Sequence, residues 1–430
     1  MMEKQIELPY GKGHIIAKIP TDRLSAILSG TLDEFVPNAS SFDIVKHAMQ
    51  NPIASKPLYQ LAKNKDKVVI IASDHTRPVP SKLLMPFLLQ ETRKGNPFAD
   101  ITILIATGCH RETSKAELIN KFGKEIVENE KIVVHDCHNQ ADMVELGTLP
   151  SGGTLSLNRL AVQADLLIAE GFIEPHFFAG YSGGRKSVLP GVASATTVYY
   201  NHCSSFISDK NASYGSLAEN PIQKDMMWAA SKARLAYILN VVINSKHEVI
   251  AAYAGDFDKA HLAGVSFLDS LCLEKPVYSD IVISTNNGYP LDQNIYQSVK
   301  GIKTASLTCK PGGIIIMVAK CEDGCGSDAL YDTFANDLTL KEILHAIKNT
   351  PAELTTLDQW QAQVQVDILT KHQIIFVSDA PEKLIKDLRM IPATTIEDAL
   401  SKAEQLLNNT NATITLIPQG NSIVIKEAIL

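Results

Sequence analysis

Residues 164–192 read ADLLIAEGFIEPHFFAGYSGGRKSVLPGV, an apolar run followed by a loop rich in glycine and basic residues. The apolar run, residues 164–173, is typical of a fully buried strand. The loop contributes His176, glycines at positions 180, 183 and 184, and the basic pair Arg185 and Lys186. Glycines allow positive φ angles and let the backbone approach a bound group closely. We therefore expect a ligand-binding loop, with the rest of the chain forming a scaffold that brings partner residues to Lys186.

The same succession of apolar strand and polar loop occurs earlier in the chain. Strands are predicted for residues 67–73 (KVVIIAS), 101–106 (ITILIA) and 131–135 (KIVVH), and helices from about Ser81 and over residues 114–129. Alternating strands and helices predict a parallel sheet with helices on both faces. Polar clusters follow three of the strands, at residues 74–77, 107–111 and 176–186. Because ligands bind at the carboxyl edge of open α/β sheets, these three loops together predict a single site.

A chain of 430 residues is too long for one hydrophobic core, so more than one domain is expected. Residues 5–19 are predicted to form a hairpin, and residues 235–244 and 247–256 an antiparallel pair of strands. A linker is predicted at residues 273–276, before a second strand-and-helix series that begins at Ser279. The expected division is an N-terminal α/β domain (1–272), a C-terminal α/β domain (277–410) and tail strands (411–430) that complete either domain.

Composition excludes several classes of protein. The hydrophobic fraction of 45% and the charged fraction of 20% are ordinary for a globular protein. No apolar run is long enough to span a membrane, and the N-terminus lacks the apolar core of an export signal. The net charge of −7 argues against binding to nucleic acid. Seven dispersed cysteines indicate reduced thiols, so we expect a cytoplasmic protein.

Lys186 is open to three interpretations. GYSGGRKS (180–187) nearly matches the phosphate-binding P-loop pattern, but Arg185 stands where that pattern requires glycine. That interpretation gives a nucleotide-dependent phosphotransferase. A lysine fixed among glycines is also suited to act as a nucleophile that binds a cofactor covalently, as the Schiff-base lysine of a pyridoxal-phosphate enzyme does. The third interpretation is an exposed lysine in a flexible loop.

Three histidines and several cations complete the candidate site. His110, His176 and His202 lie in or beside the polar loops, where two imidazoles can serve as an acid/base pair and a third can bind a metal. Arg77 is suited to bind a carboxylate or phosphate. In the C-terminal half, Gln297 and Lys300 are three residues apart on a predicted helix and therefore share a face.

Taken together, these segments resemble the nickel-dependent lactate racemase family. The resemblance covers nearly the whole chain and rests on SDHTRP (73–78), TGCHR (107–111), PHFFAGYSGGRKSVLPG (175–191), Asn201-His202 and YQSVKG (296–301). The glycine-lysine segment is highly specific, whereas each of the others is weak alone. The family implies two α/β domains with the active site in the cleft between them.

The resemblance also implies a cofactor, a nickel pincer nucleotide (the nickel complex of pyridinium-3,5-bisthiocarboxylic acid mononucleotide). Lys186 would tether it through a thioamide, and His202 would supply the remaining nickel ligand. The other residues implied to bind the cofactor are Asp74, His75, Thr76 and Arg77. His110 and His176 would be the acid/base pair. Substrate would be held by Arg77, Tyr296, Gln297 and Lys300, with Trp360 at the pocket wall.

The implied reaction is the racemisation or epimerisation of lactate or a related 2-hydroxy acid. The α-proton of such an acid is very weakly acidic because the neighbouring carboxylate is already anionic. Reversible hydride transfer to the cofactor avoids the dianion and passes through a 2-keto acid, while one histidine on each side handles the hydroxyl proton. Cofactor-synthesis and nickel-delivery proteins are the implied partners, and protein made without them is expected to lack the cofactor. A protein that merely carries the cofactor would not need both histidines.

Overall fold

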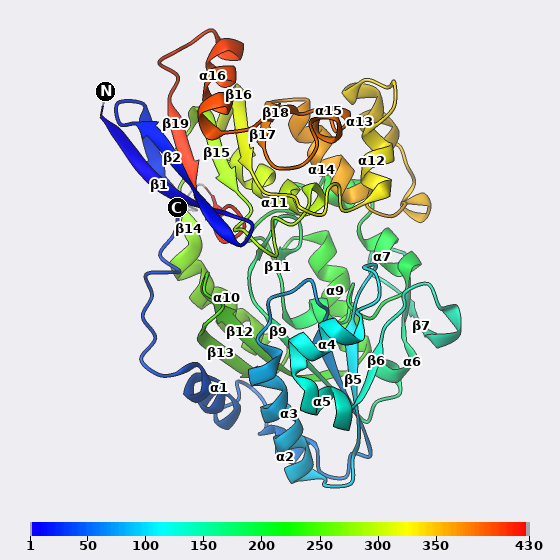
Figure 1. Ribbon diagram of the computed structural model, residues 1–430. Helices are drawn as coiled ribbons and strands as arrows, with labels where there is room; N and C mark the ends of the chain where they lie inside the picture. Colours follow the sequence, from blue (N-terminus) through cyan, green and yellow to red (C-terminus); the bar gives the residue numbers. More distant parts are fainter. Residues whose placement is uncertain (1, 427–430) are drawn as a thin grey trace. The chain divides into compact units, whose positions relative to one another are not determined.

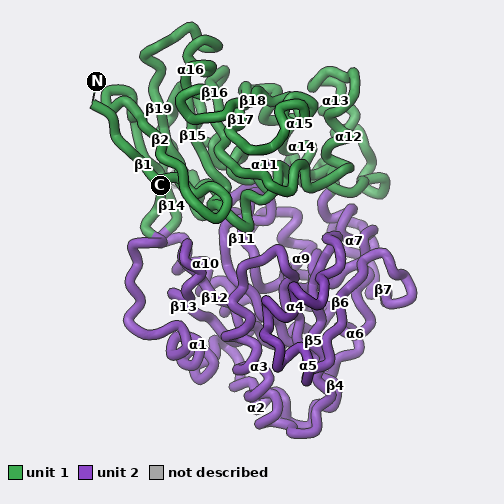
Figure 2. The backbone as a smooth tube through the Cα atoms, viewed as in Figure 1, with its two compact units in different colours: residues 1–31, 203–208, 272–430 green, residues 32–202, 209–271 purple. Residues whose placement is uncertain are grey.

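The computed structural model describes residues 2–426, which form two compact units (Figure 2). Unit 2 comprises Leu32–His202 and Asp209–Leu271. Unit 1 comprises the residues up to Thr31, the short segment Cys203–Ser208, and the chain from Cys272 onward. Each unit contains its own six-stranded sheet with helices packed against it (Figure 1). The predicted fold of two α/β domains with mostly parallel sheets is confirmed.

The sheet of unit 2 has the strand order β13-β12-β9-β4-β5-β6. Its strands are β4 (Lys67–Ser73), β5 (Asp100–Ala106), β6 (Lys131–Val134), β9 (Leu166–Phe172), β12 (Leu235–Ile243) and β13 (Val249–Gly255). Neighbouring strands are parallel, except that β13 runs antiparallel to β12. The strands predicted from apolar runs and the predicted antiparallel pair are therefore confirmed.

The order of these strands places the polar loops together. Strands β5 and β6, which follow β4 in the sequence, lie on one side of it in the sheet, and the later strand β9 lies on its other side. The ends of β4 and β9 therefore form a topological switch point, where open α/β sheets bind ligands. Because β5, β4 and β9 are parallel neighbours, the loops that follow them leave the same edge of the sheet. The prediction of three polar loops at one edge is confirmed.

Unit 2 also contains helices and two short hairpins. They are α1 (Ser41–Gln50), α2 (Leu58–Leu61), α3 (Ser81–Gly95), α4 (Lys115–Phe122), α5 (Lys124–Asn129), α6 (Arg159–Val162), α7 (Ala195–Asn201), α9 (Pro221–Lys232), α10 (Lys259–Cys272), β7 (Met143–Thr148) with β8 (Thr154–Asn158), and β10 (Pro175–His176) with β11 (Gly180–Tyr181). Apolar side chains of α1 to α4 form one core with the sheet. The single helix predicted over residues 114–129 is wrong, because Gly123 adopts φ +87° and separates α4 from α5.

The sheet of unit 1 is entirely parallel, with the order β18-β17-β16-β15-β19-β3. Its strands are β3 (Leu24–Ile27), β15 (Ser279–Thr285), β16 (Cys309–Val318), β17 (Gln373–Val377), β18 (Ile391–Ala393) and β19 (Ile414–Ile417). The helices are α8 (Ser204–Ile207), α11 (Ile295–Ser306), α12 (Asp328–Phe334), α13 (Leu340–Lys348), α14 (Gln359–Leu369), α15 (Glu382–Asp387) and α16 (Ile396–Leu407). Two strand pairs accompany them: β1 (Glu3–Tyr10) with β2 (Gly13–Pro20), and β14 (Leu273–Glu274) with β20 (Val424–Ile425).

The compact units differ from the expected domains (1–272, 277–410 and 411–430) at the two ends of the chain. Residues 1–31 belong to unit 1, because β3 pairs with β19 at the edge of its sheet and the predicted hairpin, now β1–β2, packs Leu8 and Ile19 into its core. The tail also belongs to unit 1, since β19 lies between β15 and β3 and β20 pairs with β14 of the predicted linker. Residues 427–430 of the expected tail lie outside the described residues.

Candidate active site

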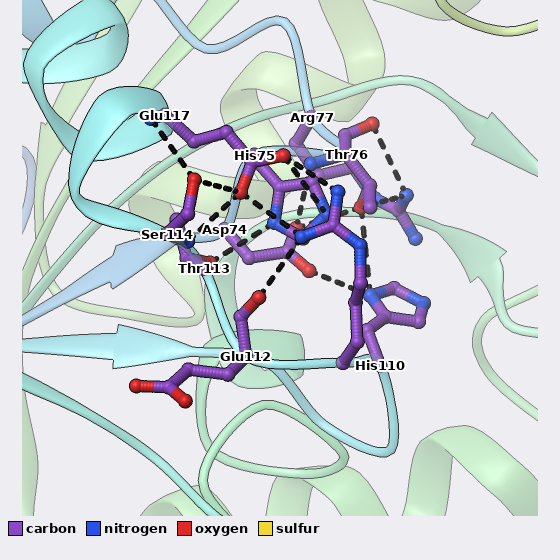
Figure 3. Close-up of polar contacts among 10 residues, drawn as sticks. Asp74, His75, Thr76, Arg77, His110, Glu112, Thr113, Ser114 and Glu117 are labelled. Atoms are coloured by element: carbon purple, nitrogen blue, oxygen red, sulfur yellow. Dashed lines mark hydrogen bonds and ion pairs between the residues drawn. The ribbon is translucent and has the colours of Figure 1, made fainter.

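Asp74 and His110 form a close pair at the ends of β4 and β5. Asp74 Oδ2 lies 2.6 Å from His110 Nδ1, and the carboxylate is 1% exposed while the imidazole is 35% exposed (Figure 3). Burial by itself raises the pKa of Asp74, but His110, Arg77 and hydrogen bonds from Thr76 together lower it well below its usual range. An ionised Asp74 accepts a hydrogen bond from Nδ1–H. The neutral ring of His110 therefore carries its lone pair on Nε2, the form that can act as a base.

The loop after β4 is held by hydrogen bonds of its own side chains. The backbone N–H and hydroxyl of Thr76 donate to Asp74 Oδ1, at 3.1 and 2.7 Å. The Arg77 guanidinium donates to the Thr76 hydroxyl at 2.9 Å. From α4, Lys121 Nζ donates to the Arg77 carbonyl at 3.2 Å. These contacts fix the Asp74 carboxylate, so they also fix the direction in which it orients His110.

His75 joins this loop to the segment that follows β5. Its Nδ1 lies 3.0 Å from the Thr113 hydroxyl, and its Nε2 lies 3.9 Å from Glu117 Oε1 (Figure 3). Burial lowers the pKa of His75, which favours the neutral ring. Glu117 in turn caps α4 through Ser114 and pairs with Arg111. The contacts described for His75 thus tie two loops together, and its role in cofactor binding stays a prediction.

A second cluster surrounds Phe178 in the loop after β9. The His176 ring centroid lies 4.5 Å from the Phe178 centroid, and the His202 centroid lies 5.1 Å from it. Lys186 Nζ is 5.9 Å from the same centroid. Three residues that the sequence nominated separately, His176, Lys186 and His202, therefore meet around one aromatic ring.

His202 has the form of a metal ligand. It follows the last turn of α7, where its Nδ1 lies 3.0 Å from the Val198 carbonyl and donates to it. The neutral ring then carries its lone pair on Nε2. Burial, together with the Lys186 charge, lowers the pKa of His202 to about 3. The ring is neutral at physiological pH, as metal coordination requires.

His176 carries its proton on the other ring nitrogen. The Ala179 backbone N–H donates to His176 Nδ1 at 3.3 Å. A neutral His176 therefore has its lone pair on Nδ1 and its proton on Nε2, opposite to His110. In these neutral forms His110 presents a lone pair at Nε2, whereas His176 presents an N–H there.

The glycines before Lys186 are required by space as well as by backbone conformation. Gly183 adopts φ +79°, and a Cβ there would lie 2.7 Å from Asn240 Oδ1 and 2.9 Å from the Phe172 carbonyl. Its neighbour Gly184 donates its N–H to Asn240 Oδ1 at 2.7 Å, and the Lys186 N–H donates to the Gly183 carbonyl at 3.1 Å. These two amides are used inside the protein, whereas a P-loop turns its amides toward phosphate. The phosphotransferase hypothesis loses its main support.

The loops after β5 and β9 are connected by their backbones. The Gly108 N–H donates to the Gly191 carbonyl at 3.0 Å, and the Gly191 N–H donates to the Lys186 carbonyl at 3.2 Å. The segment that carries His110 is therefore linked through two hydrogen bonds to the segment that carries Lys186.

The residues predicted to bind substrate from the C-terminal half lie on packed helices of unit 1. Gln297 and Lys300, both on α11, are buried rather than solvated. Gln297 Oε1 has no hydrogen-bond partner among the described residues. Tyr296 donates its hydroxyl to Asp358 at 2.9 Å, and Trp360 is buried on α14, which packs against α11. Their contact with substrate stays a prediction.

Comparison with known proteins identifies the family. Residues 10–215 match the lactate racemase N-terminal domain, and residues 274–425 match the lactate racemase C-terminal domain. The lactate racemase of Thermoanaerobacterium thermosaccharolyticum is 49% identical over 423 residues, which cover 98% of this chain and 99% of that protein. The chain belongs to the lactate racemase family. The family predicted from the sequence motifs is confirmed, and so is the enzyme class, an isomerase of the racemase type.

Further comparisons agree with this family. The lactate racemase of Lactiplantibacillus plantarum is 46% identical, over 98% of this chain and 99% of that protein. The structure of the lactate racemase apoprotein from T. thermosaccharolyticum matches with a TM-score of 0.95 and 48% identity, covering 99% of this chain and all of that one. A Thermotoga maritima protein shares the fold with a TM-score of 0.66, at 18% identity over 91% of this chain and all of that protein.

Two kinds of feature are absent from the described residues. Over residues 2–426, no three His, Cys, Asp or Glu side chains gather in a way that could hold a metal ion. Nor is any helix in the same range long and apolar enough to cross a membrane.

Sequence reasoning missed several residues that hold the site. Lys121 and Thr113 fix the loops after β4 and β5, and Asn240 fixes the glycine loop from β12. Lys121 precedes the buried Phe122 on α4. No pattern around Lys121 in the sequence indicates that its side chain bonds to the loop after β4. The sequence suggests Arg185 as a second cation beside Lys186 and as the residue that departs from the P-loop pattern. It is turned into the protein, where it bonds to other groups.

Proposed function

We propose that this chain racemises lactate by means of a nickel pincer nucleotide that Lys186 tethers and His202 ligates. The observation that carries the proposal is that His110 is paired with Asp74 and that His176, His202 and Lys186 meet around Phe178, in a chain 49% identical to a protein named lactate racemase. A racemase needs one group on each side of the substrate that accepts the hydroxyl proton as a neutral ring and returns it as an imidazolium, and His110 and His176 are the two imidazoles proposed for this.

The residues around Phe178 fit the nickel pincer nucleotide. A neutral His202 offers the Nε2 lone pair that nickel accepts. The amine of Lys186 is the group that forms a thioamide. Gly183 admits no Cβ, so the backbone of this loop keeps its close contacts only with glycine at that position. The chain would supply one imidazole, from His202, and the remaining nickel donors, including the sulfur of the Lys186 thioamide, would belong to the cofactor.

The chain's own residues manage protons and substrate charge. When bound, the cofactor supplies an acceptor for the substrate α-hydrogen as hydride. His110 takes the hydroxyl proton at Nε2, and Asp74 stabilises the resulting imidazolium through Nδ1–H. For the opposite enantiomer, His176 takes the hydroxyl proton at Nε2 from its own side, once its ring proton has moved from Nε2 to Nδ1. Arg77 and Lys300 hold the carboxylate, with Tyr296 and Gln297 beside Lys300 on α11, so the keto acid turns without leaving.

A racemisation assay tests the proposal. Protein co-produced with the cofactor-synthesis and nickel-delivery enzymes is incubated with D-lactate or L-lactate, and the optical composition is followed by chiral chromatography. His110→Asn and His176→Asn are each expected to lower the rate by about 100-fold or more, the usual contribution of an acid/base group. His138→Asn, a change at an exposed histidine of the same unit, is the matched control and keeps the rate.

The outcomes separate the candidate functions. A full rate in either variant removes that histidine from the mechanism. If lactate is inert while a larger 2-hydroxy acid is racemised, the mechanism stands and the substrate changes. An imine absorption band that borohydride removes would instead indicate pyridoxal phosphate on Lys186. A protein that holds the cofactor but racemises no 2-hydroxy acid would be a carrier.

A further inference from the structure

Arg185 is the largest fully buried side chain in the described part of the protein, with 1% of its surface exposed. It lies in the short 3-10 helix Gly184–Ser187, next to Lys186. Its Nε donates to Gln223 Oε1 on α9. Its terminal nitrogens donate to three backbone carbonyls, those of Ala179 at 2.9 Å, Gly183 at 3.2 Å and Ser182 at 3.5 Å. One guanidinium thus binds the loop at three points and anchors it to a helix.

This guanidinium is surrounded by neutral groups. Within residues 2–426, no carboxylate lies within ion-pair distance of it, and Asp258 acts on it only from farther away. Burial lowers the pKa of Arg185 to about 9, so the side chain is still charged at neutral pH. Burial and the Arg185 charge lower the pKa of the adjacent His261 to about 3, which keeps that ring neutral. A buried charge is costly unless its hydrogen bonds are made, so the four acceptors around Arg185 are held tightly.

One carbonyl connects Arg185 directly to Lys186. The Gly183 carbonyl accepts from the Arg185 guanidinium at 3.2 Å and also from the Lys186 backbone N–H at 3.1 Å. Moving the Gly183 carbonyl therefore moves the backbone of Lys186. His261 adds a further restraint, because its Nε2 lies 2.8 Å from the Ser182 carbonyl.

We propose that Arg185 is a positioning residue for Lys186, which sets the place of the cofactor tether by holding the carbonyls of residues 179–183. The proposal rests on the tether role of Lys186 under the proposed function. Lysine is no substitute for Arg185, because its donors radiate from one atom whereas the planar guanidinium fork reaches acceptors on different sides. Charge alone is therefore insufficient at this position.

The first test uses Arg185→Ala in protein free of cofactor. Hydrogen exchange of the amides in residues 179–188 is measured by mass spectrometry, with the amides of β4 and β5 as an internal reference. Loop exchange is expected to rise about tenfold or more while the reference amides change little, as for a local opening. Methylguanidinium at millimolar concentration is expected to restore protection, whereas methylammonium is not. Arg159→Ala, at an exposed arginine of the same unit that also donates to carbonyls, is the control.

Three results would overturn the proposal. The first is an unchanged exchange rate in residues 179–188. The second is an equal rise in exchange in the loop and the reference amides, as expected for an ordinary core residue. The third is equal restoration of protection by methylguanidinium and methylammonium. If Arg185→Ala does not fold, Gln223→Ala decides, because it removes one acceptor and leaves the arginine. Faster exchange confined to residues 179–188 then supports the proposal, and unchanged exchange contradicts it.

A second readout separates this proposal from the proposed function. Arg185→Lys is co-produced with the cofactor-synthesis enzymes, and the fraction of chains that carry an adduct on Lys186 is measured by intact mass. At least a tenfold loss relative to wild type is expected. If Arg185→Lys carries the adduct in the same fraction of chains as wild type, the positioning role of Arg185 is contradicted, and the tether role of Lys186 is not. Failure of the wild-type chain to load contradicts the tether itself, and leaves the hydrogen-exchange result to judge Arg185.

Discussion

At the residue scale, the pair Asp74 and His110 controls where a proton resides. The carboxylate lies 2.6 Å from Nδ1 and is itself held by two hydrogen bonds from Thr76. An ionised carboxylate accepts hydrogen bonds but cannot donate one. Asp74 is therefore compatible only with the tautomer of His110 that carries its proton on Nδ1. The family resemblance implies a cofactor-binding role for Asp74, whereas its pairing with His110 is visible only in the structure, where β4 and β5 are neighbours.

Asp74→Asn tests this role of the carboxylate. The amide of asparagine donates as well as accepts, so it also stabilises the tautomer with the lone pair on Nδ1. We expect the racemisation rate to fall by about 100- to 10,000-fold, while the melting temperature changes only slightly. Chiral chromatography and thermal unfolding measure the two quantities. A variant that keeps the wild-type rate would show that Asp74 does not orient His110.

His261 gives a prediction about stability at low pH. Its pKa is lowered to about 3 in the folded protein, mainly by burial, whereas an unfolded histidine titrates near 6.5. The unfolded chain therefore binds a proton that the folded chain does not between these values, and stability from this residue is lost as the pH falls below about 6.5. When the pH is lowered from 7 to 5, the unfolding free energy of wild type should fall by about 2 kcal/mol more than that of His261→Gln, which lacks the titrating ring. Urea denaturation at both pH values measures this, and equal losses would contradict it.

At the scale of the element, the glycine loop after β9 depends on steric space as well as on backbone freedom. Gly183 and Gly123 have similar backbone angles, φ +79° and ψ −176° against φ +87° and ψ 155°. A Cβ at Gly183 would collide with Asn240 and with the Phe172 carbonyl, whereas a Cβ at Gly123 would meet nothing within 4 Å. Comparing substitutions at Gly183 and Gly123 therefore separates the free energy lost to backbone strain from the free energy lost to steric collision.

Gly183→Ala is therefore expected to be more destabilising than Gly123→Ala. Both variants carry the strain of a positive φ, about 1 to 3 kcal/mol. Only Gly183→Ala adds the collision, and it should lower the unfolding free energy by roughly a further 1 to 3 kcal/mol and reduce adduct formation at Lys186. Chemical denaturation and intact mass provide the comparison. Equal destabilisation would mean that the loop has room for a side chain.

Prediction from sequence succeeded where the signal was local. The apolar runs that became β4, β5 and β9 were recognised because each is a short continuous apolar segment that ends in a polar loop. The helix over residues 114–129 was predicted as one piece because its apolar spacing continues past Gly123, whose effect depends on its φ angle. Arg185 was misjudged for a different reason. Its side-chain acceptor Gln223 on α9 lies 38 residues away in the sequence, and no local pattern marks a buried guanidinium.

At the scale of the whole molecule, the first 31 residues are part of the fold of unit 1. Leu8 on β1 is completely buried in the core of that unit, while Ile16 on β2 is 47% exposed. The domain assignment of residues 1–31 was beyond sequence analysis, because β3 pairs with β19, nearly 400 residues later, at the other end of the chain. The chain forms two units, but their boundary does not follow the sequence.

Leu8→Ala tests this division. Truncation of a buried leucine typically costs about 2 to 5 kcal/mol, so hydrogen exchange in β15 and β16 should accelerate. Amides of β4 and β9 in unit 2 should keep their protection. Ile16→Ala, at the exposed position of the same hairpin, is the control and should leave both units unchanged. Faster exchange in β4 and β9 would instead place the hairpin's contribution in unit 2.

The central claim is that Lys186 is the tether of a nickel cofactor, and intact mass with nickel analysis tests it most directly. The chain is co-produced with the cofactor-synthesis and nickel-delivery enzymes, alongside Lys186→Ala and the exposed control Lys224→Ala. Wild type and Lys224→Ala are expected to carry an adduct of pincer-nucleotide mass, mapped to Lys186 by peptide analysis, with about one nickel per chain. Lys186→Ala is expected to carry neither. An unmodified, nickel-free wild-type chain from an active synthesis system would contradict the account.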